Sequence, residues 1–157
     1  MRGYAAIGLH RPKTPHNVGG ALRAVGCYGA ALVAMSGRRF AKAPTDVQKQ
    51  WRLTPVIQVE DLRTVIPYDC VPVAVDFVPG AKPLHEFTHP QRAFYIFGPE
   101  DSTLGGEILS WCKYRIYVPT LYCMNLAATV NVVLYDRCAK MGFPPDARVM
   151  AAPDGAC

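Results

Sequence analysis

The chain has 157 residues, of which 50% are hydrophobic and 18% are charged, and its formal net charge is +5. This composition argues against a disordered chain, and the length favours one domain with a substantial core. Its apolar stretches are about one strand long or are broken by Asn and Pro, so none reaches the roughly 20 residues of a membrane span. We therefore expect a single globular domain over residues 1–157, with a flexible tail at about 146–157 and no membrane partner.

The six cysteines and four histidines show no spacing typical of metal ligands. No C-x-x-C pair occurs, and the cysteines lie in apolar segments, where a reduced thiol behaves as a small hydrophobe. His85 and His89 are four residues apart, but Pro83 and Pro90 bracket them and leave little room for a regular helix. We expect buried thiols in a cytoplasmic protein and no metal site.

Apolar runs of strand length, bounded by Gly or Pro, predict five strands at residues 4–9, 31–36, 71–77, 93–98 and 114–118. These runs are apolar on both alternating faces, as in buried parallel strands. Helical patterns fall between or after them, at residues 16–28, about 59–66, about 103–111, and 123–141. The alternation predicts an α/β fold, a parallel sheet flanked by helices on both faces, with residues 37–57 as an irregular surface excursion.

Parallel sheets of this kind bind ligands beyond the carboxyl ends of their strands. The segments that follow the predicted strands are "LHRPKTPHN" (9–17), "DFVPG" (76–80), "FGPEDS" (97–102) and "VPTLYCMN" (118–125). The chain has no G-x-G-x-x-G after a strand, no G-x-x-x-x-G-K-[ST] and no G-x-S-x-G. These absences disfavour a dinucleotide oxidoreductase, a P-loop NTPase and a serine hydrolase.

The first predicted helix carries adjacent glycines in its first turn, Gly19 and Gly20, each of which costs about 1 kcal/mol relative to alanine. Asn17 is suited to be the N-cap, and Arg23 leans over the turn that the glycines leave bare. An exposed helix N-terminus beside a guanidinium is an anion site. The alternative is close packing through the glycines, with Arg23 as a surface charge. We favour the anion site, because close packing does not explain the arginine.

Three segments in order resemble the SpoU/TrmH branch of the SPOUT RNA methyltransferases. They are "NVGGALRAVGCYGA" (17–30), "FGPED" (97–101) and "YVPTLYCMNLAATVNVVLYD" (117–136). The first matches the family pattern N-x-G-x-x-x-R-x-x-x-x-x-G through Asn17, Gly19, Arg23 and Gly29. Together the three segments extend over most of the chain.

The resemblance implies an S-adenosylmethionine (AdoMet)-dependent methyl transfer to a ribose 2′-hydroxyl of RNA. It also implies a C-terminal trefoil knot, which pattern reasoning alone would not predict, and a homodimer. In the family the knot loops hold AdoMet largely through their backbone. The positions that correspond here are Val75, Phe77, Gly98, Tyr117, Val118, Leu121 and Met124.

Four residues carry catalytic roles by the same resemblance. Arg23 matches the family's essential arginine, and because a guanidinium stays protonated we expect it to clamp a phosphate and stabilise a developing alkoxide. Asn17 and Glu100 would position the substrate and Arg23. Asn125 would stand at the head of the last helix, facing the cofactor and the ribose. A plain N-cap is the alternative role for Asn125, and the two roles are compatible.

Two positions depart from the family pattern: Cys123 replaces a usual Ser, and Thr103 replaces a usual Gly. Because of these departures, a second function remains an alternative: a knotted module that binds RNA but has lost catalysis. A transfer to a base nitrogen in place of the ribose is a third possibility.

The chain resembles the minimal, TrmL-like members of the branch, which methylate the wobble nucleotide of tRNA, and it shares their "GPE" segment. An rRNA substrate remains the alternative. Such a chain must bind RNA through its own surface, for which we expect Arg23 and the cluster Arg38, Arg39, Lys42 and Lys49. Solvated loop charge is an equally good explanation of that cluster from composition alone.

Overall fold

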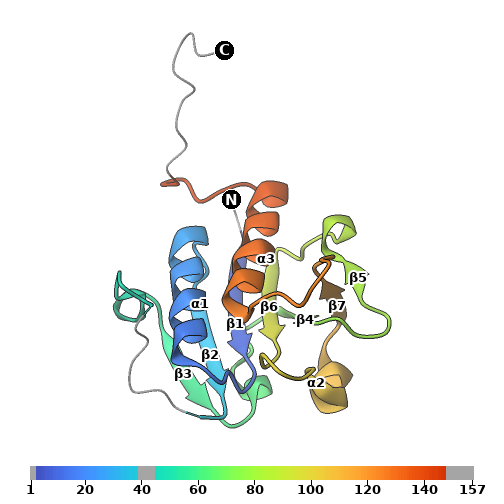
Figure 1. Ribbon diagram of the computed structural model, residues 1–157. Coiled ribbons are helices and arrows are strands. Elements are labelled where there is room, and N and C mark those ends of the chain that lie inside the picture. The colour runs from blue at the N-terminus through green and yellow to red at the C-terminus, as the bar shows by residue number, and fades with distance from the viewer. Residues whose placement is uncertain (1–2, 39–44, 148–157) are drawn as a thin grey trace.

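The computed structural model describes residues 3–38 and 45–147, which build one seven-stranded parallel sheet (Figure 1). Its strands are β1 (Tyr4–Leu9), β2 (Leu32–Ser36), β3 (Val56–Val59), β4 (Val71–Val75), β5 (Lys82–Pro83), β6 (Arg92–Phe97) and β7 (Tyr114–Tyr117). Their order across the sheet is β3-β2-β1-β6-β4-β7-β5. The predicted parallel α/β fold is confirmed. Arg39, Lys42 and residues 148–157 of the expected tail lie outside the described residues.

All five predicted strands are present, with ends that differ by at most two residues. Two strands were not predicted. β3 lies at the end of the segment expected to be irregular, and β5 has only two residues, one of them a proline. Both are edge strands, which bury one side less completely and so lack the continuous apolar run that marks the central strands.

The helices cover both faces of the sheet, as predicted. α1 (Pro15–Tyr28) and α3 (Leu126–Met141) lie side by side on one face (Figure 1). The other face packs against α2 (Gly105–Trp111) and the 3-10 turn η2 (Leu62–Val65). Two further 3-10 turns are η1 (Gln50–Arg52) and η3 (Leu84–Glu86). The predicted helix at about 59–66 is therefore only a short 3-10 turn.

Alternate residues of the central strands feed two separate cores. In β1, Ile7 points to the core under α1 and α3, and Ala6 points to the core under α2. In β6, Tyr95 and Phe94 divide in the same way, and all four side chains are fully buried. Burial on both faces is the reason that these strands are apolar throughout.

The first turn of α1 differs from the sequence prediction. The N-cap is Thr14, whose hydroxyl accepts from the Asn17 N–H, because Pro15 starts the helix two residues before Asn17. The glycines serve close packing: a Cβ at Gly19 would collide with the Thr45 hydroxyl, and a Cβ at Gly20 would lie 2.6 Å from the Ala127 Cβ of α3. The bare, anion-binding turn expected at Gly19 and Gly20 is therefore wrong.

A polar cluster fixes the C-terminal half of α3. The buried His89 ring bonds through Nε2 to the Asp136 carboxylate at 2.8 Å. The buried Arg137 guanidinium donates to the carbonyl oxygens of Pro90 and Gln91, both at 2.6 Å. Burial lowers the pKa of His89 although Asp136 opposes this. His89 is thus a core residue that anchors α3 to the segment before β6.

The cysteines are less uniformly buried than the sequence suggested. Cys70 and Cys138 are buried, whereas Cys27 and Cys123 are exposed, the first on the outer side of α1 and the second in the loop before α3. Burial raises the pKa of Cys112 to about 12. Among the described helices none is long and apolar enough to cross a membrane.

The packing of Gly19 yields a stability prediction. In Gly19→Ala the new Cβ would also lie 2.8 Å from the Asp46 amide nitrogen, so the free energy of unfolding should fall by about 1–3 kcal/mol. Gly106→Ala in α2 is the matched control, since its Cβ would meet nothing within 4 Å and alanine favours a helix by up to about 1 kcal/mol. Urea unfolding of both variants measures the difference. Equal stabilities would contradict this packing.

Candidate functional site

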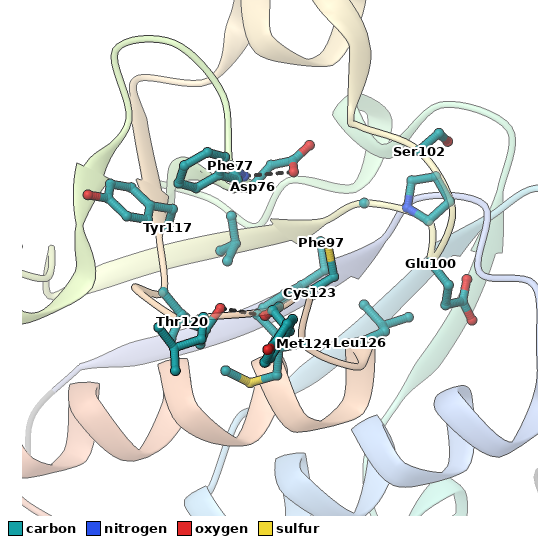
Figure 2. Close-up of a pocket in the computed structure, with 17 residues that line it drawn as sticks. Asp76, Phe77, Phe97, Glu100, Ser102, Tyr117, Thr120, Cys123, Met124 and Leu126 are labelled. Atoms are coloured by element: carbon teal, nitrogen blue, oxygen red, sulfur yellow. Dashed lines mark hydrogen bonds between the residues drawn. The ribbon is translucent and has the colours of Figure 1, made fainter.

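A cavity of about 610 Å³ opens where β4, β6 and β7 end (Figure 2). Three of the four loop segments selected from the sequence line it, the ones that follow these strands. All seven residues predicted to hold the cofactor are in its wall: Val75, Phe77, Gly98, Tyr117, Val118, Leu121 and Met124. The structure therefore gathers into one site residues that are up to 49 positions apart in the chain.

Aromatic and aliphatic side chains dominate one side of the cavity. The rings of Phe77 and Tyr117 meet edge to face, with centroids 5.1 Å apart. Phe77 is 80% exposed and Leu121 94% exposed, so apolar surface remains uncovered at the rim. Glu100 and Ser102 lie on the opposite side (Figure 2). The cavity thus offers an apolar wall facing a polar one, as small-molecule sites commonly do.

Asp76 shapes the loops of this cavity and was not selected from the sequence. Its two carboxylate oxygens accept from the backbone N–H groups of Phe77 and Leu104, each at 2.7 Å. It thereby ties the loop after β4 to the loop that leads into α2. The only signal in the sequence was its place in the strand-end segment "DFVPG", because its partner lies 28 residues away.

A chain of hydrogen bonds joins the three sequence motifs beside the cavity. Asn17 donates from Nδ2 to Oε1 of Glu100 at 2.7 Å. Asn125 donates from Nδ2 to Oδ1 of Asn17 at 2.6 Å. Glu100 also accepts from the backbone N–H groups of Lys13 at 2.9 Å and Thr14 at 3.3 Å. Three of the four predicted catalytic residues are therefore in one network.

The Glu100 carboxylate is held ionised by its partners. Burial alone would raise its pKa, but the hydrogen bonds from Asn17 and from the backbone of Lys13 and Thr14 outweigh this, and the pKa lies below its usual range. Both of its oxygens already accept hydrogen bonds from these donors. Glu100 is thus suited to fix its neighbours and poorly suited to accept a proton from a substrate.

Asn125 is the N-cap of α3, as the sequence suggested. Its Oδ1 accepts from the N–H groups of Ala127 at 2.9 Å and Ala128 at 3.2 Å, while its Nδ2 serves Asn17. Leu126 and Thr129 of the first turn then line the cavity. The cap therefore sets where α3 begins and how that turn faces the site.

Arg23 stands apart from the network. It is exposed on α1, does not line the cavity and makes no hydrogen bond or ion pair within the described part of the chain. Neither Asn17 nor Glu100 contacts Arg23 in the described structure, so the expectation that they position it stays a prediction. The carboxylate and the amide bond to each other, and Asn17 is buried on the inner face of the helix.

The basic segment beyond β2 is described in part. Arg38 and Lys49 are exposed. Trp51, which the sequence analysis did not select, is 53% exposed, and the Arg52 guanidinium lies 5.0 Å from the centre of its ring. An exposed aromatic ring among cations is typical of surfaces that bind single-stranded nucleic acid.

The two departures from the family pattern lie at the site and near it. Cys123 lines the cavity, so its thiol occupies the position of the usual hydroxyl. Thr103 is exposed, and the left-handed residue of its loop is Gly105, with φ of 77°. The loop before α2 therefore turns two residues after the position where the family has glycine.

Comparison with known proteins relates this geometry to characterised ones. The chain is 28% identical over 151 residues to the tRNA (cytidine(34)-2′-O)-methyltransferase of Escherichia coli (strain K12), covering 88% of this chain and 94% of that protein. A solved structure described as giving insights into the 2-OH methylation of C/U34 on tRNA superposes with a TM-score of 0.74 at 18% identity, covering 90% and 98%.

The SpoU methyltransferase AviRb from Streptomyces viridochromogenes superposes with a TM-score of 0.77 at 18% identity, covering 89% of this chain and 60% of that one. The chain thus spans well under two thirds of AviRb. A family model, the SpoU rRNA Methylase family, matches residues 4–135. This match includes every strand of the described structure, the cavity and the network of Asn17, Glu100 and Asn125, and the chain therefore belongs to the SpoU rRNA Methylase family, whose methyltransferases use AdoMet.

Proposed function

We propose that this chain transfers a methyl group from AdoMet to the ribose 2′-hydroxyl of the wobble nucleotide of tRNA. The observation that carries the proposal is the cavity of about 610 Å³, flanked by the hydrogen-bonded residues of all three family motifs. The relative from Escherichia coli (strain K12), which acts on cytidine 34 of tRNA by its name, supports this substrate. An rRNA substrate is the second candidate, favoured by the family's description.

The cavity fits AdoMet in size and in character. Its volume lies within the range of about 300–1,000 Å³ typical of small-molecule sites. Phe77, Tyr117 and Leu121 offer the apolar surface that a purine base requires, and we assign the cofactor to them together with Val75, Gly98, Val118 and Met124. Bound there, AdoMet supplies an electrophilic methyl group on a sulfonium centre.

The chain's own residues then have separate tasks. Arg23 holds the phosphate next to the reacting ribose and stabilises negative charge on its 2′-oxygen, because a guanidinium remains protonated and binds phosphate in a bidentate manner. Asn17 and Asn125 hold the loops of the site in register through amides whose orientation is fixed. Glu100 keeps Asn17 in place.

We assign RNA binding to the exposed cations beyond β2. Arg38 and Lys49 lie in this segment, and Arg39 and Lys42 belong to the same run of sequence. The exposed ring of Trp51 gives a base a surface to stack on. The formal net charge of +5 favours association with a polyanion.

We also propose a homodimer that forms through α1 and α3. The ring of Tyr135, 54% exposed, meets the rings of Tyr28 and Phe143 with centroids 6.2 and 5.8 Å apart. With Val132, 36% exposed, these residues form an apolar patch that a second copy would cover.

A C-terminal knot in a single cytoplasmic domain completes the proposal. α3 follows β7 yet packs beside α1, where Gly20 approaches Ala127. The connection at 118–125 must therefore cross the ends of β4 and β6, whose loops line the same cavity as the connection. We propose that it passes through the loop between them.

The test of function uses isotopically labelled AdoMet with total tRNA and, separately, rRNA. We expect a labelled 2′-O-methyl nucleoside from the anticodon wobble position, identified by nuclease digestion and mass spectrometry. A label found on a base would mean that the enzyme methylates a base nitrogen and not the ribose. No transfer to either RNA, together with no AdoMet binding by calorimetry, would leave an RNA-binding module in place of an enzyme.

Arg23→Ala should abolish most turnover without loss of fold. The side chain is exposed and has no partner among the described residues, so stability and AdoMet affinity should stay unchanged. Loss of a group that stabilises an oxyanion typically costs about 10²–10³-fold in kcat. Single-turnover kinetics with tRNA measure the effect. Arg23→Lys keeps the positive charge but loses the paired N–H donors of the guanidinium, so its rate should fall between those of the wild type and Arg23→Ala. Unchanged turnover in Arg23→Ala would remove the assigned role.

Glu100→Gln should impair the site through its neighbours. The new amide keeps only one acceptor oxygen, so its NH₂ group would face either the Asn17 amide and the Thr14 N–H or the Lys13 N–H, and a donor left unpaired in a buried site costs about 1–3 kcal/mol. We expect at least a tenfold fall in kcat/KM. Asp101→Asn is the matched control, since it removes the adjacent charge, whose partners Lys13 and Ser102 are both at the surface. Equal effects in the two variants would contradict a positioning role for Glu100.

A further inference from the structure

A second hollow lies at the outer edge of β7, and none of the described residues assigned above lines it. β5 pairs with Ile116 and Tyr117 alone, so among the described strands none pairs with the outer edge of β7 at Tyr114 and Arg115. The result is a notch of about 370 Å³ in the edge of the sheet. We call it the β7-edge notch, and Gly80, Lys82, Phe87, Lys113, Tyr114 and Arg115 line it.

The notch collects positive charge that the fold does not neutralise. Lys82, Lys113 and Arg115 all line it, and none of them forms an ion pair with a carboxylate of the described residues. None of the described residues in its wall is acidic. Three cations around one hollow repel each other, and a bound anion would remove that repulsion.

The side chains of the notch differ in how firmly they are held. The Arg115 guanidinium donates to the carbonyl oxygens of Leu109 at 3.4 Å and Pro79 at 3.5 Å, which places it across the base of the loop at Gly80. Lys82 and Lys113 are exposed and reach into solvent. Two exposed ammonium groups beside a guanidinium that faces backbone carbonyls supply hydrogen-bond donors of the kind that bind a phosphate.

An aromatic ring stands next to these cations. Tyr114 is 40% exposed, and the Lys113 ammonium lies 5.6 Å from the centre of its ring. Phe87 supports the ring from behind, edge to face, with centroids 5.6 Å apart. A supported, half-exposed ring beside cations suits a nucleotide, whose base can stack while its phosphate is bound.

The notch adjoins the cofactor cavity through two short pieces of chain. Phe77 lines the cavity and Gly80 lines the notch, and three residues of chain reach at most about 11 Å. On β7, Tyr117 lines the cavity and Arg115 lines the notch. The two residues are two positions apart on one strand, so their backbones lie about 7 Å from each other. One RNA strand can therefore occupy both.

We propose that the β7-edge notch is a second RNA subsite, in which Lys82, Lys113 and Arg115 hold a backbone phosphate of the RNA whose ribose reacts in the cofactor cavity. The proposal rests on the proposed function for its choice of RNA as the source of the phosphate. It adds a contact on the opposite side of the cavity from the basic segment beyond β2, so the substrate is held on both sides of the reacting nucleotide.

Lys82→Gln and Lys113→Gln test this subsite, and Arg115 is left intact because it also binds backbone carbonyls. Each variant should weaken tRNA binding three- to tenfold at 0.1 M salt. Each should also lower the slope of log affinity against log salt by about 0.7, the value for one phosphate contact on a single strand. AdoMet affinity, measured by calorimetry, should remain unchanged.

Arg63→Gln is the matched control, since it removes one exposed positive charge on η2, outside both hollows. Lysine variants that bind tRNA as tightly as this control, with the same salt slope, would overturn the subsite even if the enzyme methylates normally. If the wild type transfers no methyl group but the lysine variants still lose tRNA affinity, the proposed reaction fails and the subsite stands.

A titration with inorganic phosphate separates the two sources of the ligand. For an RNA subsite we expect millimolar or weaker binding of free phosphate. Micromolar phosphate binding that the lysine variants lose, with tRNA affinity intact, would overturn RNA as the occupant in favour of a free anion.

Discussion

The hydrogen-bonded chain from Asn125 through Asn17 to Glu100 is the constraint on which the site depends. It joins residues 108 and 83 positions apart in the sequence with bonds of 2.6 and 2.7 Å. An ionised carboxylate only accepts hydrogen bonds, so the Asn17 amide can take one orientation only, with its NH₂ group toward Glu100 and its oxygen toward Asn125. The positions of three loops are thereby set by one buried side chain, and a change at any member disturbs loops that it does not touch.

The register of the sheet brings the residues of this hydrogen-bonded network close together. Leu9 pairs with Phe97, and Phe97 pairs with Val75, so β1, β6 and β4 end at the same level. Val75 also pairs with Ile116 of β7, so β7 ends close to the same level as its neighbour β4. Loops that leave parallel strands at one level start about 5 Å apart. Short polar side chains such as Asn and Glu can then bridge them, and the cavity forms between the same loops.

The sequence predicted the central elements and the edge of the sheet where the cavity lies, because both depend on local patterns. Apolar runs mark strands that are buried on both faces, and every residue assigned to the cofactor by motif lies in one cavity. The failures involve contacts between distant segments. Gly19 fits against Thr45 and Asp46, which belong to an irregular segment with no periodicity, and its packing could not be read from the helix alone. Likewise β5 has two residues, too few for any pattern.

Helix α1 separates the two halves of the proposed chemistry. Arg23 follows Asn17 by six residues, so the two side chains leave the helix about 120° apart and about 9 Å from each other along its axis. Asn17 faces the interior, where it belongs to the hydrogen-bonded framework, and Arg23 faces solvent without a partner in the described structure. The framework is thus complete without substrate, whereas the Arg23 charge, which we propose to act on the ribose, has no partner among the described residues. In the proposed mechanism an RNA phosphate supplies that partner, so specificity for RNA and assembly of the reactive arrangement are the same event.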